Sequence, residues 1–376
     1  MSITFNTLCK ELELSPSFEN ESQLSTLESW CQAHVSQDIC FQGDSKTRYS
    51  QYYELASNYL DNFLVHLPNN LASKITYFDD CTPIHYAAIQ GYDHFIANQS
   101  DLTKNILNET DAYGMTALHK AAIQGYLFTV KALLAKGASV DIPNSRKQYP
   151  LHSALFLPIL HEKALIKKKE TIFRTLLAIA PHLLLVHDCD GNTALHHMAE
   201  QGFVPILSEV LQKNEKLAFV KNKASLYPIH TAILNNQPQV VDVLLAIEGV
   251  SSLGDGQNRI PLHYAARYGN STIIQSCCRA TSNINCQDSE RKTPLLWAAI
   301  AENQEALEIL IQHGADITLS DYENKNILHY AVISQNQAIV QWIINNLDNA
   351  LLNQPDNQGK KPLDYEQNSY NLKFGS

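Results

Sequence analysis

The stretch Thr116-Ala117-Leu118-His119 decides the fold, because close copies of it recur along most of the chain. The other seven copies read Thr82-Pro83-Ile84-His85, Tyr149-Pro150-Leu151-His152, Thr193-Ala194-Leu195-His196, Tyr227-Pro228-Ile229-His230, Ile260-Pro261-Leu262-His263, Thr293-Pro294-Leu295-Leu296 and Asn326-Ile327-Leu328-His329. All intervals between their fourth positions but one are 33 or 34 residues, and a worn ninth copy begins at Lys361. Such regular self-similarity predicts an array of stacked structural units.

Each copy begins a unit whose residues predict two short helices. Proline suits a first helical turn, and the threonine before it can cap that helix. An alanine pair such as Ala121-Ala122 follows and lets two helices approach closely, and a second apolar segment such as 130–134 comes next. Gly137 then stands where a left-handed helix end is needed. Turn residues such as Asp111-Ala112-Tyr113-Gly114 separate the units.

This pattern resembles the ankyrin repeat, whose period is about 33 residues and whose signature is T-P-L-H-x-A. The resemblance covers residues 77–370. It implies an all-α solenoid of helix-turn-helix units with β-hairpin fingers, with about eight full repeats and a partial ninth. In that family the histidine of the phrase hydrogen-bonds within the turn region and ties neighbouring repeats together. The resemblance therefore implies a structural role for His85, His119, His152, His196, His230, His263 and His329.

Composition restricts the class of protein. A chain of 376 residues exceeds the size of one hydrophobic core, a limit that repeat arrays escape because each unit packs only on its neighbours. The formal net charge of −10 argues against nucleic-acid binding. Eight scattered cysteines without C-x-x-C pairs are typical of a reducing compartment. No signal peptide or long apolar run is visible, so we expect a monomeric cytoplasmic protein that does not insert into membranes.

One repeat, spanning about 144–187, is enlarged, because its interval of 44 residues exceeds the usual 33 by 11. The extra residues lie between its two helices, so we expect both helices to be lengthened at the edge opposite the fingers. The insertion carries the lysine run Lys167-Lys168-Lys169, which we interpret as a solvated face. The alternative is a docking patch for an acidic partner, because insertions in repeat proteins often serve binding.

Residues 1–76 do not match the repeat. Apolar residues at helical spacing predict an amphipathic helix over about 47–67. We interpret the segment as a helical cap, because the end of a stack must cover its apolar side. The alternative is a small functional domain. Cys31 and His34 lie one helical turn apart, as a cysteine-dependent enzyme would need, and Leu67-Pro68 is similar to the opening of an F-box, a family that binds the adaptor of a ubiquitin ligase.

The rest of the sequence predicts binding and no catalysis. It has no glycine-rich phosphate loop, H-E-x-x-H or paired-cysteine zinc pattern, so we predict no enzyme activity, cofactor or metal. Ankyrin repeats bind proteins with their finger tips and first helices, and the resemblance implies the same concave surface here. The exposed finger and first-helix positions predicted to bind a partner protein are Tyr113, Met115, Arg146, Phe156, Arg259, Arg267, Tyr268, Tyr322 and Lys325.

Residue usage points to a biological setting. The chain is rich in asparagine, glutamine, isoleucine and lysine, a bias common in AT-rich genomes. Ankyrin chains of this kind resemble effectors that intracellular bacteria inject into host cells. The resemblance therefore implies a protein-interaction scaffold that a bacterium secretes into the host cytosol, where it acts on host proteins.

Deleting residues 1–76 should distinguish the two interpretations of that segment. Removal of a cap exposes the apolar side of the first repeat, so the free energy of unfolding and the solubility should both fall. Urea unfolding and sedimentation measure these two quantities. A catalytic segment would instead be lost with no change in the stability of the repeats. In the full chain, Cys31→Ala should preserve partner-linked function, and loss of that function in a normally folded variant would favour catalysis.

Overall fold

The computed structural model describes residues 81–99, 102–157, 163–346 and 349–368, and it divides into two compact units. The first unit contains α5 (Pro83–Gln90), α6 (Asp93–Asn98), α7 (Lys104–Leu107), α8 (Ala117–Gln124), α9 (Leu127–Ala135), α10 (Pro150–Ser153) and α11 (Lys163–Ile179). The second contains η2 (Pro181–Leu185), α12 (Ala194–Gln201), α13 (Val204–Lys213), η3 (Glu215–Phe219), α14 (Pro228–Leu234), α15 (Pro238–Leu245), η4 (Val250–Ser252), α16 (Pro261–Tyr268), α17 (Ser271–Ala280), α18 (Pro294–Ile300), α19 (Gln304–Gln312), α20 (Ile327–Ile333), α21 (Gln337–Asn346), η5 (Asn349–Asn353) and η6 (Pro362–Asn368).

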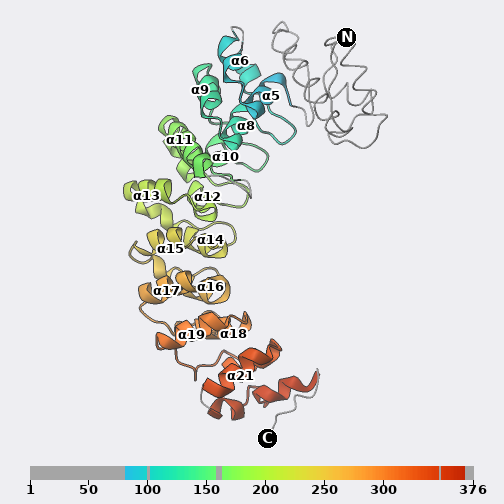
Figure 1. Ribbon diagram of the computed structural model, residues 1–376, viewed down its shortest axis with the longest axis vertical. Coiled ribbons are helices and arrows are strands. Elements are labelled where there is room, and N and C mark those ends of the chain that lie inside the picture. The colour runs from blue at the N-terminus through green and yellow to red at the C-terminus, as the bar shows by residue number, and fades with distance from the viewer. Residues whose placement is uncertain (1–80, 100–101, 158–162, 347–348, 369–376) are drawn as a thin grey trace, which may run out of the picture. The chain divides into compact units, whose positions relative to one another are not determined.

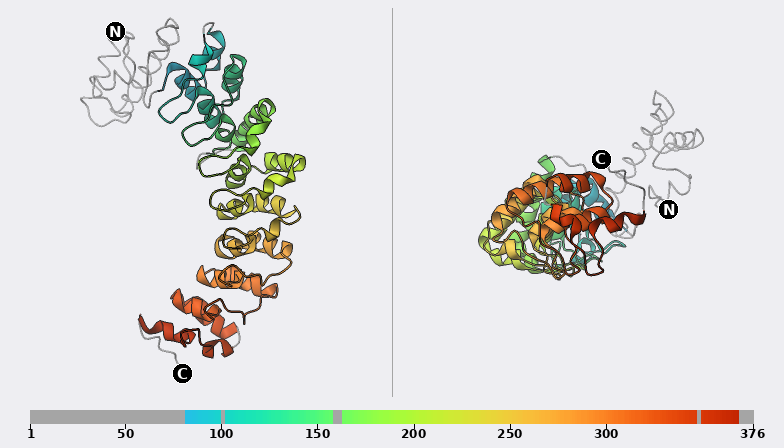
Figure 2. Two further views of the ribbon diagram at one scale, coloured as in Figure 1. Left: turned by 180° about the vertical axis from the view of Figure 1, so that it is seen from behind. Right: turned by 90° about the horizontal axis from the view of Figure 1, so that it is seen from below.

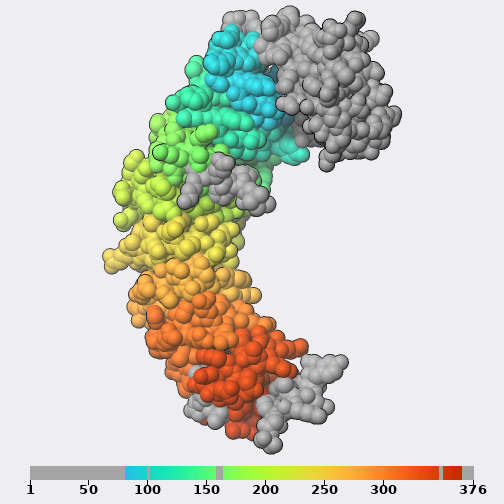
Figure 3. Space-filling view, in the orientation of Figure 1, coloured from blue at the N-terminus to red at the C-terminus, as the bar shows by residue number. Residues whose placement is uncertain are grey.

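In each unit the helices form pairs that stack on the next pair (Figure 1). In the second unit the first helices α12, α14, α16 and α18 lie side by side along the inner side of its curve. The second helices α13, α15, α17 and α19 lie along the outer side (Figure 2). The space-filling view shows these repeats in close contact along the stack (Figure 3). The predicted all-α solenoid is confirmed for the described residues.

The recurring phrase starts each first helix in the expected way. At α8, Thr116 is the N-cap and has extended backbone angles. The ring of His119 accepts the backbone N–H of Thr116 at 3.1 Å through Nδ1, so one unpaired donor of the helix start is satisfied. Leu118 and the pair Ala121 and Ala122 are fully buried. The small side chains therefore serve the close helix approach that the sequence predicts.

The second ring nitrogen of these histidines ties one repeat to the next. Because Nδ1 accepts a backbone N–H, the proton resides on Nε2, which donates to a carbonyl of the following repeat. His119 reaches the carbonyl of Gln148 at 3.0 Å, and His263 reaches that of Lys292 at 3.1 Å. The same bond joins His85 to Met115, His196 to Leu226 and His329 to Lys360. The predicted structural role is confirmed for these five histidines. His152 and His230 also accept the backbone N–H at the start of their own helices. Among the described residues, Nε2 of His230 has no hydrogen-bond partner, and one further repeat has Leu296 in place of the histidine.

The fingers between repeats are tight turns, each built on one aspartate or asparagine, which is buried in every described finger except that of Asn222. In the first described finger, Oδ1 of Asp111 accepts the backbone N–H of Tyr113 at 2.9 Å and of Met115 at 2.8 Å. The turn requires a left-handed residue at Gly114, where φ is 73° and a Cβ would lie 2.8 Å from the backbone nitrogen of Ser145. None of the described residues is in a β-strand, so the predicted β-hairpin fingers are present only as hairpin turns. The remaining fingers begin at Asn144, Asp188, Asn222, Asp255, Asp288, Asp321 and Asp356.

The enlarged repeat differs from its prediction. Its second helix, α11, is lengthened to 17 residues, but its first helix, α10, has only four. The expectation that both helices are lengthened is therefore wrong for the first. Lys167 and Lys168 are exposed as predicted, whereas Lys169 is fully buried, so the interpretation of the whole run as a solvated face is also wrong.

Lys169 is buried because it caps the neighbouring helix. Its Nζ donates to the carbonyl oxygens of Ala122 at 3.2 Å and Ile123 at 2.5 Å, which belong to the last turn of α8. A cation at a helix C-terminus is favourable because the unpaired carbonyls there carry partial negative charge. In other repeats a side-chain amide binds the same kind of carbonyl, as Gln237 does at Glu200. Burial lowers the pKa of Lys169 to about 8.

The predictions for residues 1–76 lie outside the described residues. They include the helix over 47–67, the pair Cys31 and His34, and the F-box-like Leu67-Pro68. Residues 158–162 of the insertion also lie outside them. The array itself is described from residue 81 to residue 368 with short gaps.

The buried histidines make stability depend on pH. Burial lowers the pKa of His119, His196 and His230 to about 4, against about 6.5 in the unfolded chain. The unfolded state therefore binds more protons between pH 6.5 and 4, and stability is lost as the pH falls through that range. At pH 5 we expect a loss on the order of 1–2 kcal/mol per histidine relative to pH 7, measured by urea unfolding.

Matched variants identify the source of this loss. His313 is exposed, so His313→Ala should leave the difference between pH 7 and pH 5 unchanged. His119→Gln should reduce the difference by the share of one histidine. Equal stability of the native chain at the two pH values would show that these rings do not titrate as proposed.

Candidate protein-binding surface

The predicted partner-binding residues of the first unit lie on its fingers. Tyr113 is 54% exposed at the tip of its finger, and its ring lies 6.0 Å from Nζ of Lys120. Arg146 is exposed on the next finger. Met115 is half-buried, and its carbonyl accepts the bond from His85. The two tips are therefore accessible, whereas Met115 contributes mainly through its backbone.

Four predicted residues of the second unit present open side chains. Phe156 is 57% exposed after the end of α10, and Tyr322 is 72% exposed at a finger tip. Tyr268, at the end of α16, is 49% exposed, and its neighbour Arg267 is partly exposed. Exposed aromatic and arginine side chains are the groups that most often anchor protein interfaces.

Arg259 and Lys325 were predicted to be exposed on the fingers. Both lie instead at the bases of their fingers and are only partly exposed. Arg259 donates to Oδ2 of Asp255 through Nε at 2.8 Å and Nη2 at 2.6 Å. Lys325 pairs with Glu323, and only 15% of its side chain is exposed. In both fingers the aspartate four residues earlier accepts the backbone N–H of the cationic residue, for example Asp255 that of Arg259 at 2.9 Å. This hydrogen bond holds the cationic residue at the base of the finger.

The finger aspartates also hold a donor on the first helix of their own repeat. Oδ2 of Asp255 accepts the hydroxyl of Tyr264 at 2.8 Å, and Oδ2 of Asp288 accepts Nε1–H of Trp297 at 2.9 Å. The donor stands nine residues after the aspartate, and the same spacing pairs Asp111 with Lys120, Asp188 with His197, Asp321 with Tyr330 and Asp356 with Tyr365. Where the finger begins with asparagine, this position holds the short Ser153 or Thr231.

Cations and rings alternate along the last four fingers and form what we call the cation–aromatic stripe. It consists of Arg259, Tyr264, Lys292, Trp297, Lys325, Tyr330, Lys360 and Tyr365. Arg259 lies 5.2 Å from the ring of Tyr264 and 5.8 Å from that of Trp297 in the next repeat. Lys292 lies 5.7 Å from both Trp297 and Tyr330. Each such contact contributes about 0.5–1 kcal/mol at a partly exposed site, so the stripe joins neighbouring repeats.

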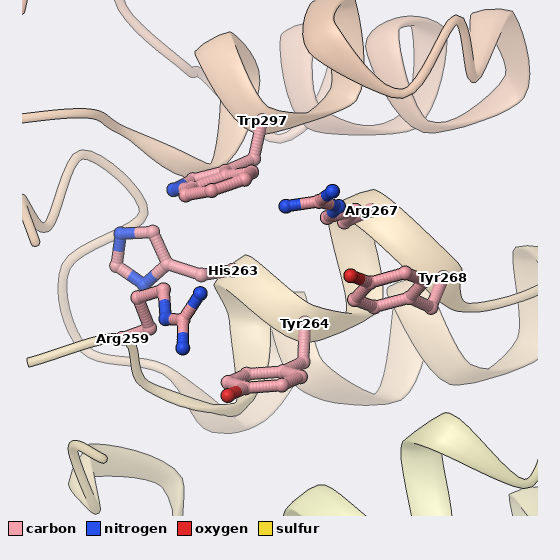
Figure 4. A pocket seen from close by; sticks show the side chains of 6 residues that line it. All are labelled: Arg259, His263, Tyr264, Arg267, Tyr268 and Trp297. Atoms are coloured by element: carbon pink, nitrogen blue, oxygen red, sulfur yellow. The ribbon is translucent and has the colours of Figure 1, made fainter. Parts of the chain in front are cut away.

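A shallow, open pocket lies on this surface, between α16 and α18 (Figure 4). Its buried floor consists of His263, Tyr264 and Trp297, and its rim consists of Arg259, Arg267 and Tyr268. Sites for whole small molecules are usually deep enough to bury most of the ligand. This shallow pocket instead suits contact with the end of a side chain from a protein partner.

The charges around the pocket are ordered by hydrogen bonds. Burial alone would raise the pKa of Asp255, but the bonds from Arg259, two backbone N–H groups and Tyr264 outweigh it and lower the pKa to about 2. Asp255 is therefore ionised at neutral pH and pairs with Arg259. Among the residues that the structure describes, Arg267 has no hydrogen bond and no ion pair, and lies 4.7 Å from the ring of Trp297 and 5.0 Å from that of Tyr268.

Sequence reasoning found the rim of the pocket but not its floor. It selected Arg259, Arg267 and Tyr268, which the structure brings together, and it missed Tyr264 and Trp297. A signal was present, because both stand at the variable position x of T-P-L-H-x-A. An aspartate nine residues earlier, in the finger, marks each of them.

The described part of the chain offers little for catalysis. Among these residues, no group of three or more histidine, cysteine or acidic side chains is placed to hold a metal ion. Burial raises the pKa of Cys278 to about 11 and that of Cys286 to about 12, so neither thiol is ionised near neutral pH. No helix within the described ranges has the length and apolar character to cross a membrane.

Comparison with known families gives one result along most of the chain. Residues 55–144, 160–253 and 262–356 match a family model described as three copies of ankyrin repeats. Together these segments make up more than half of the chain. The first match begins inside the segment 1–76 that the sequence analysis set apart.

Known proteins resemble the chain over parts of their length. The human transient receptor potential cation channel subfamily A member 1 is 25% identical over 246 residues, which are 62% of this chain and 20% of the channel. Mouse NF-kappa-B inhibitor delta is 36% identical over 103 residues, 27% of this chain and 31% of the inhibitor. The chain therefore spans less than a third of either relative. The crystal structure of the human ASB11 ankyrin repeat domain shares the fold, with a TM-score of 0.51 and 21% identity over 63% of this chain and 99% of that domain.

Changing Tyr330 to Phe should test the bond between finger and helix. The hydroxyl donates at 2.5 Å to Oδ2 of Asp321, whose side chain is buried. Without it the carboxylate loses a buried partner, so we expect the free energy of unfolding to fall by about 1–2 kcal/mol, measured by urea unfolding.

Two further variants separate this bond from the loss of any hydroxyl. Tyr322→Phe removes a hydroxyl from an exposed tip and should leave stability unchanged. Adding Asp321→Asn to Tyr330→Phe should restore part of the loss, because asparagine holds the same turn at Asn144 and removes the buried charge. Native stability in the single variant Tyr330→Phe would contradict this role of the bond.

Proposed function

Because the chain belongs to the ankyrin-repeat family, we propose that it is a scaffold that binds a partner protein through the inner face of its repeats and catalyses no reaction. Ankyrin repeats are protein-interaction modules, and the fold places first helices and fingers on one continuous side of each unit. We propose this side of the second unit as the main recognition surface.

The observation that carries the proposal is the set of open side chains around the pocket. Leu234 and Ile333 are each 41% exposed on first helices, and Tyr268 between them is 49% exposed. Tyr322 stands at a finger tip in the same unit, 72% exposed. Apolar groups gathered on one surface and rimmed by polar residues are typical of protein-interaction sites. The pocket supplies the concave feature into which a partner side chain can insert.

The contacts of the chemical groups favour binding over catalysis. Five histidines of the repeated phrase make hydrogen bonds between repeats, as His119 and His196 do, and burial lowers the pKa of both of these rings. The thiols of Cys278 and Cys286 remain protonated, because burial raises their pKa. These observations support binding over covalent catalysis, which requires an activated nucleophile beside a base.

We extend the proposal to a setting. Residue usage typical of AT-rich genomes supports a monomeric bacterial effector that enters the host cytosol and binds a host protein there. The formal charge of −10 supports a protein partner over nucleic acid. The lysines of the insertion remain a second candidate surface, because Lys167 and Lys168 are exposed.

The double variant Arg267→Ala with Tyr268→Ala should weaken partner binding severely. Truncating one true anchor costs about 2 kcal/mol or more, which corresponds to roughly thirtyfold in affinity. The measurement is capture from host-cell lysate on the immobilised native chain and on the variant, with quantitative mass spectrometry. Host proteins enriched on the native chain should be depleted on the variant, while its thermal unfolding stays within a few degrees because both side chains lie at the surface.

The control exchanges charge at the insertion. Lys167→Glu with Lys168→Glu should leave the captured proteins unchanged, and Lys169 is kept because it caps α8. The proposal fails if the double variant on α16 captures the same proteins as the native chain while the lysine variant loses them. In that case the inserted edge would be the recognition surface.

A further inference from the structure

Arg267 differs from the residues at the equivalent position of neighbouring repeats. Four residues after the end of the phrase, the helices α14, α16, α18 and α20 present Leu234, Arg267, Ile300 and Ile333, and α12 presents Glu200. Leu234 and Ile333 are exposed, and Ile300 is partly exposed. From α14 to α20, a single arginine thus interrupts a row of apolar side chains on the inner face.

The guanidinium of Arg267 lies against two aromatic rings but has no hydrogen-bond acceptor within the described residues. It lies 4.7 Å from the ring of Trp297 and 5.0 Å from that of Tyr268 (Figure 4). Trp297 is itself held by its bond to Asp288 at 2.9 Å, so that side of the guanidinium contacts a fixed ring. No described carboxylate pairs with Arg267, in contrast to Arg259, which pairs with Asp255. The guanidinium therefore keeps its hydrogen-bond donors for a group outside the unit.

The surroundings specify the charge of that group. Asp255 neutralises Arg259, so the pocket has the uncompensated positive charge of Arg267 and no free carboxylate in its lining. A cationic side chain would be repelled, although aromatic rings line the pocket. An apolar side chain would leave the donors of Arg267 unpaired and buried, which costs free energy.

We propose that the pocket formed by Arg267, Trp297 and Tyr268 binds one aspartate or glutamate side chain of the partner protein, between apolar residues that pack on Leu234 and Ile300. The proposal rests on the proposed scaffold function and names the chemistry that its inner face recognises. Arginine held against aromatic rings suits this role, because its planar fork binds a carboxylate through two parallel hydrogen bonds.

One acidic residue fits better than a polyanion. The chain has a formal net charge of −10, so a partner with many negative charges would be repelled at long range. Lys292 and Lys325 on the neighbouring fingers are already paired with Glu290 and Glu323, so they offer no unpaired cation to a second acidic residue. A partner segment with one carboxylate between apolar residues would therefore complement Arg267 between Leu234 and Ile300.

The test selects ligands from a phage-displayed library of random 12-residue peptides on the full chain. Peptides enriched on the native chain should share one aspartate or glutamate flanked by apolar residues. The best peptide is then synthesised with the acid and with the corresponding amide, and affinities are measured by fluorescence anisotropy. On the native chain the amide should bind at least tenfold more weakly, whereas on Arg267→Gln the two peptides should bind equally.

Matched variants and one altered peptide sharpen the result. Arg279→Gln changes an exposed arginine on the outer helix α17 and should keep the preference for the acid. Arg267→Glu should enrich peptides with lysine or arginine in place of the acid. A phosphoserine peptide that binds tenfold more tightly than the acidic one would overturn the carboxylate assignment in favour of a phosphate.

The remaining outcomes separate this inference from the scaffold function. Enriched peptides without an acidic preference, whose binding is lost with Leu234→Ala or Ile333→Ala but not with Arg267→Gln, would overturn the acid pocket and leave the inner face as the recognition surface. If no peptide is enriched on the native chain above an unrelated repeat protein, both proposals are overturned.

Discussion

The imidazole ring that bridges two repeats is the interaction on which the rest of the structure depends. Its Nδ1 accepts the N–H at the start of its own helix, and its Nε2 donates to the finger of the next repeat, as His119 and His263 show. A buried ring that satisfies two backbone groups fixes both the helix start and the spacing between repeats. The finger aspartate is the second fixed point, because one carboxylate oxygen holds the turn and the other holds a side chain of the inner helix. Between them these two residues determine which side chains reach the inner face.

The sequence alone was sufficient for the architecture because both devices leave a trace at a fixed interval. The recurring phrase located the first helices of the described array, and the excess of 11 residues located the enlarged repeat. The fate of that insertion was not predictable in the same way. A lysine run reads as solvated, and only the positions of the carbonyls at Ala122 and Ile123 reveal that Lys169 enters the core. Lys169 can be buried only because another repeat supplies its hydrogen-bond acceptors. The residues next to Lys169 in the sequence do not reveal these acceptors.

The candidate surface could be predicted only in part, because its side chains also depend on contacts that the sequence does not reveal. Periodicity identified Arg267 and Tyr268 as inner-face residues, because helix positions follow from the count after the histidine. It placed Arg259 and Lys325 among the exposed finger residues, because a count of residues does not reveal that Arg259 binds Asp255 or that Lys325 pairs with Glu323. The spacing of nine residues between a finger aspartate and its helix donor was visible in the sequence, yet its meaning required the hydrogen bonds. Once known, it distinguishes side chains that hold the scaffold, such as Trp297, from those left open for a partner.

Leu296 removes one of the bonds between repeats. A repeat array unfolds along one dimension, so the strength of each boundary between neighbours determines where it opens. Leucine cannot donate to the finger that follows, so the boundary between α18 and α20 lacks a bond worth about 1 kcal/mol that His263 makes between α16 and the next repeat. The boundary before α16 lacks it as well, because Nε2 of His230 on α14 has no hydrogen-bond partner within the described residues. The pocket between α16 and α18 therefore spans a boundary that keeps the histidine bond and is flanked on each side by a boundary without it.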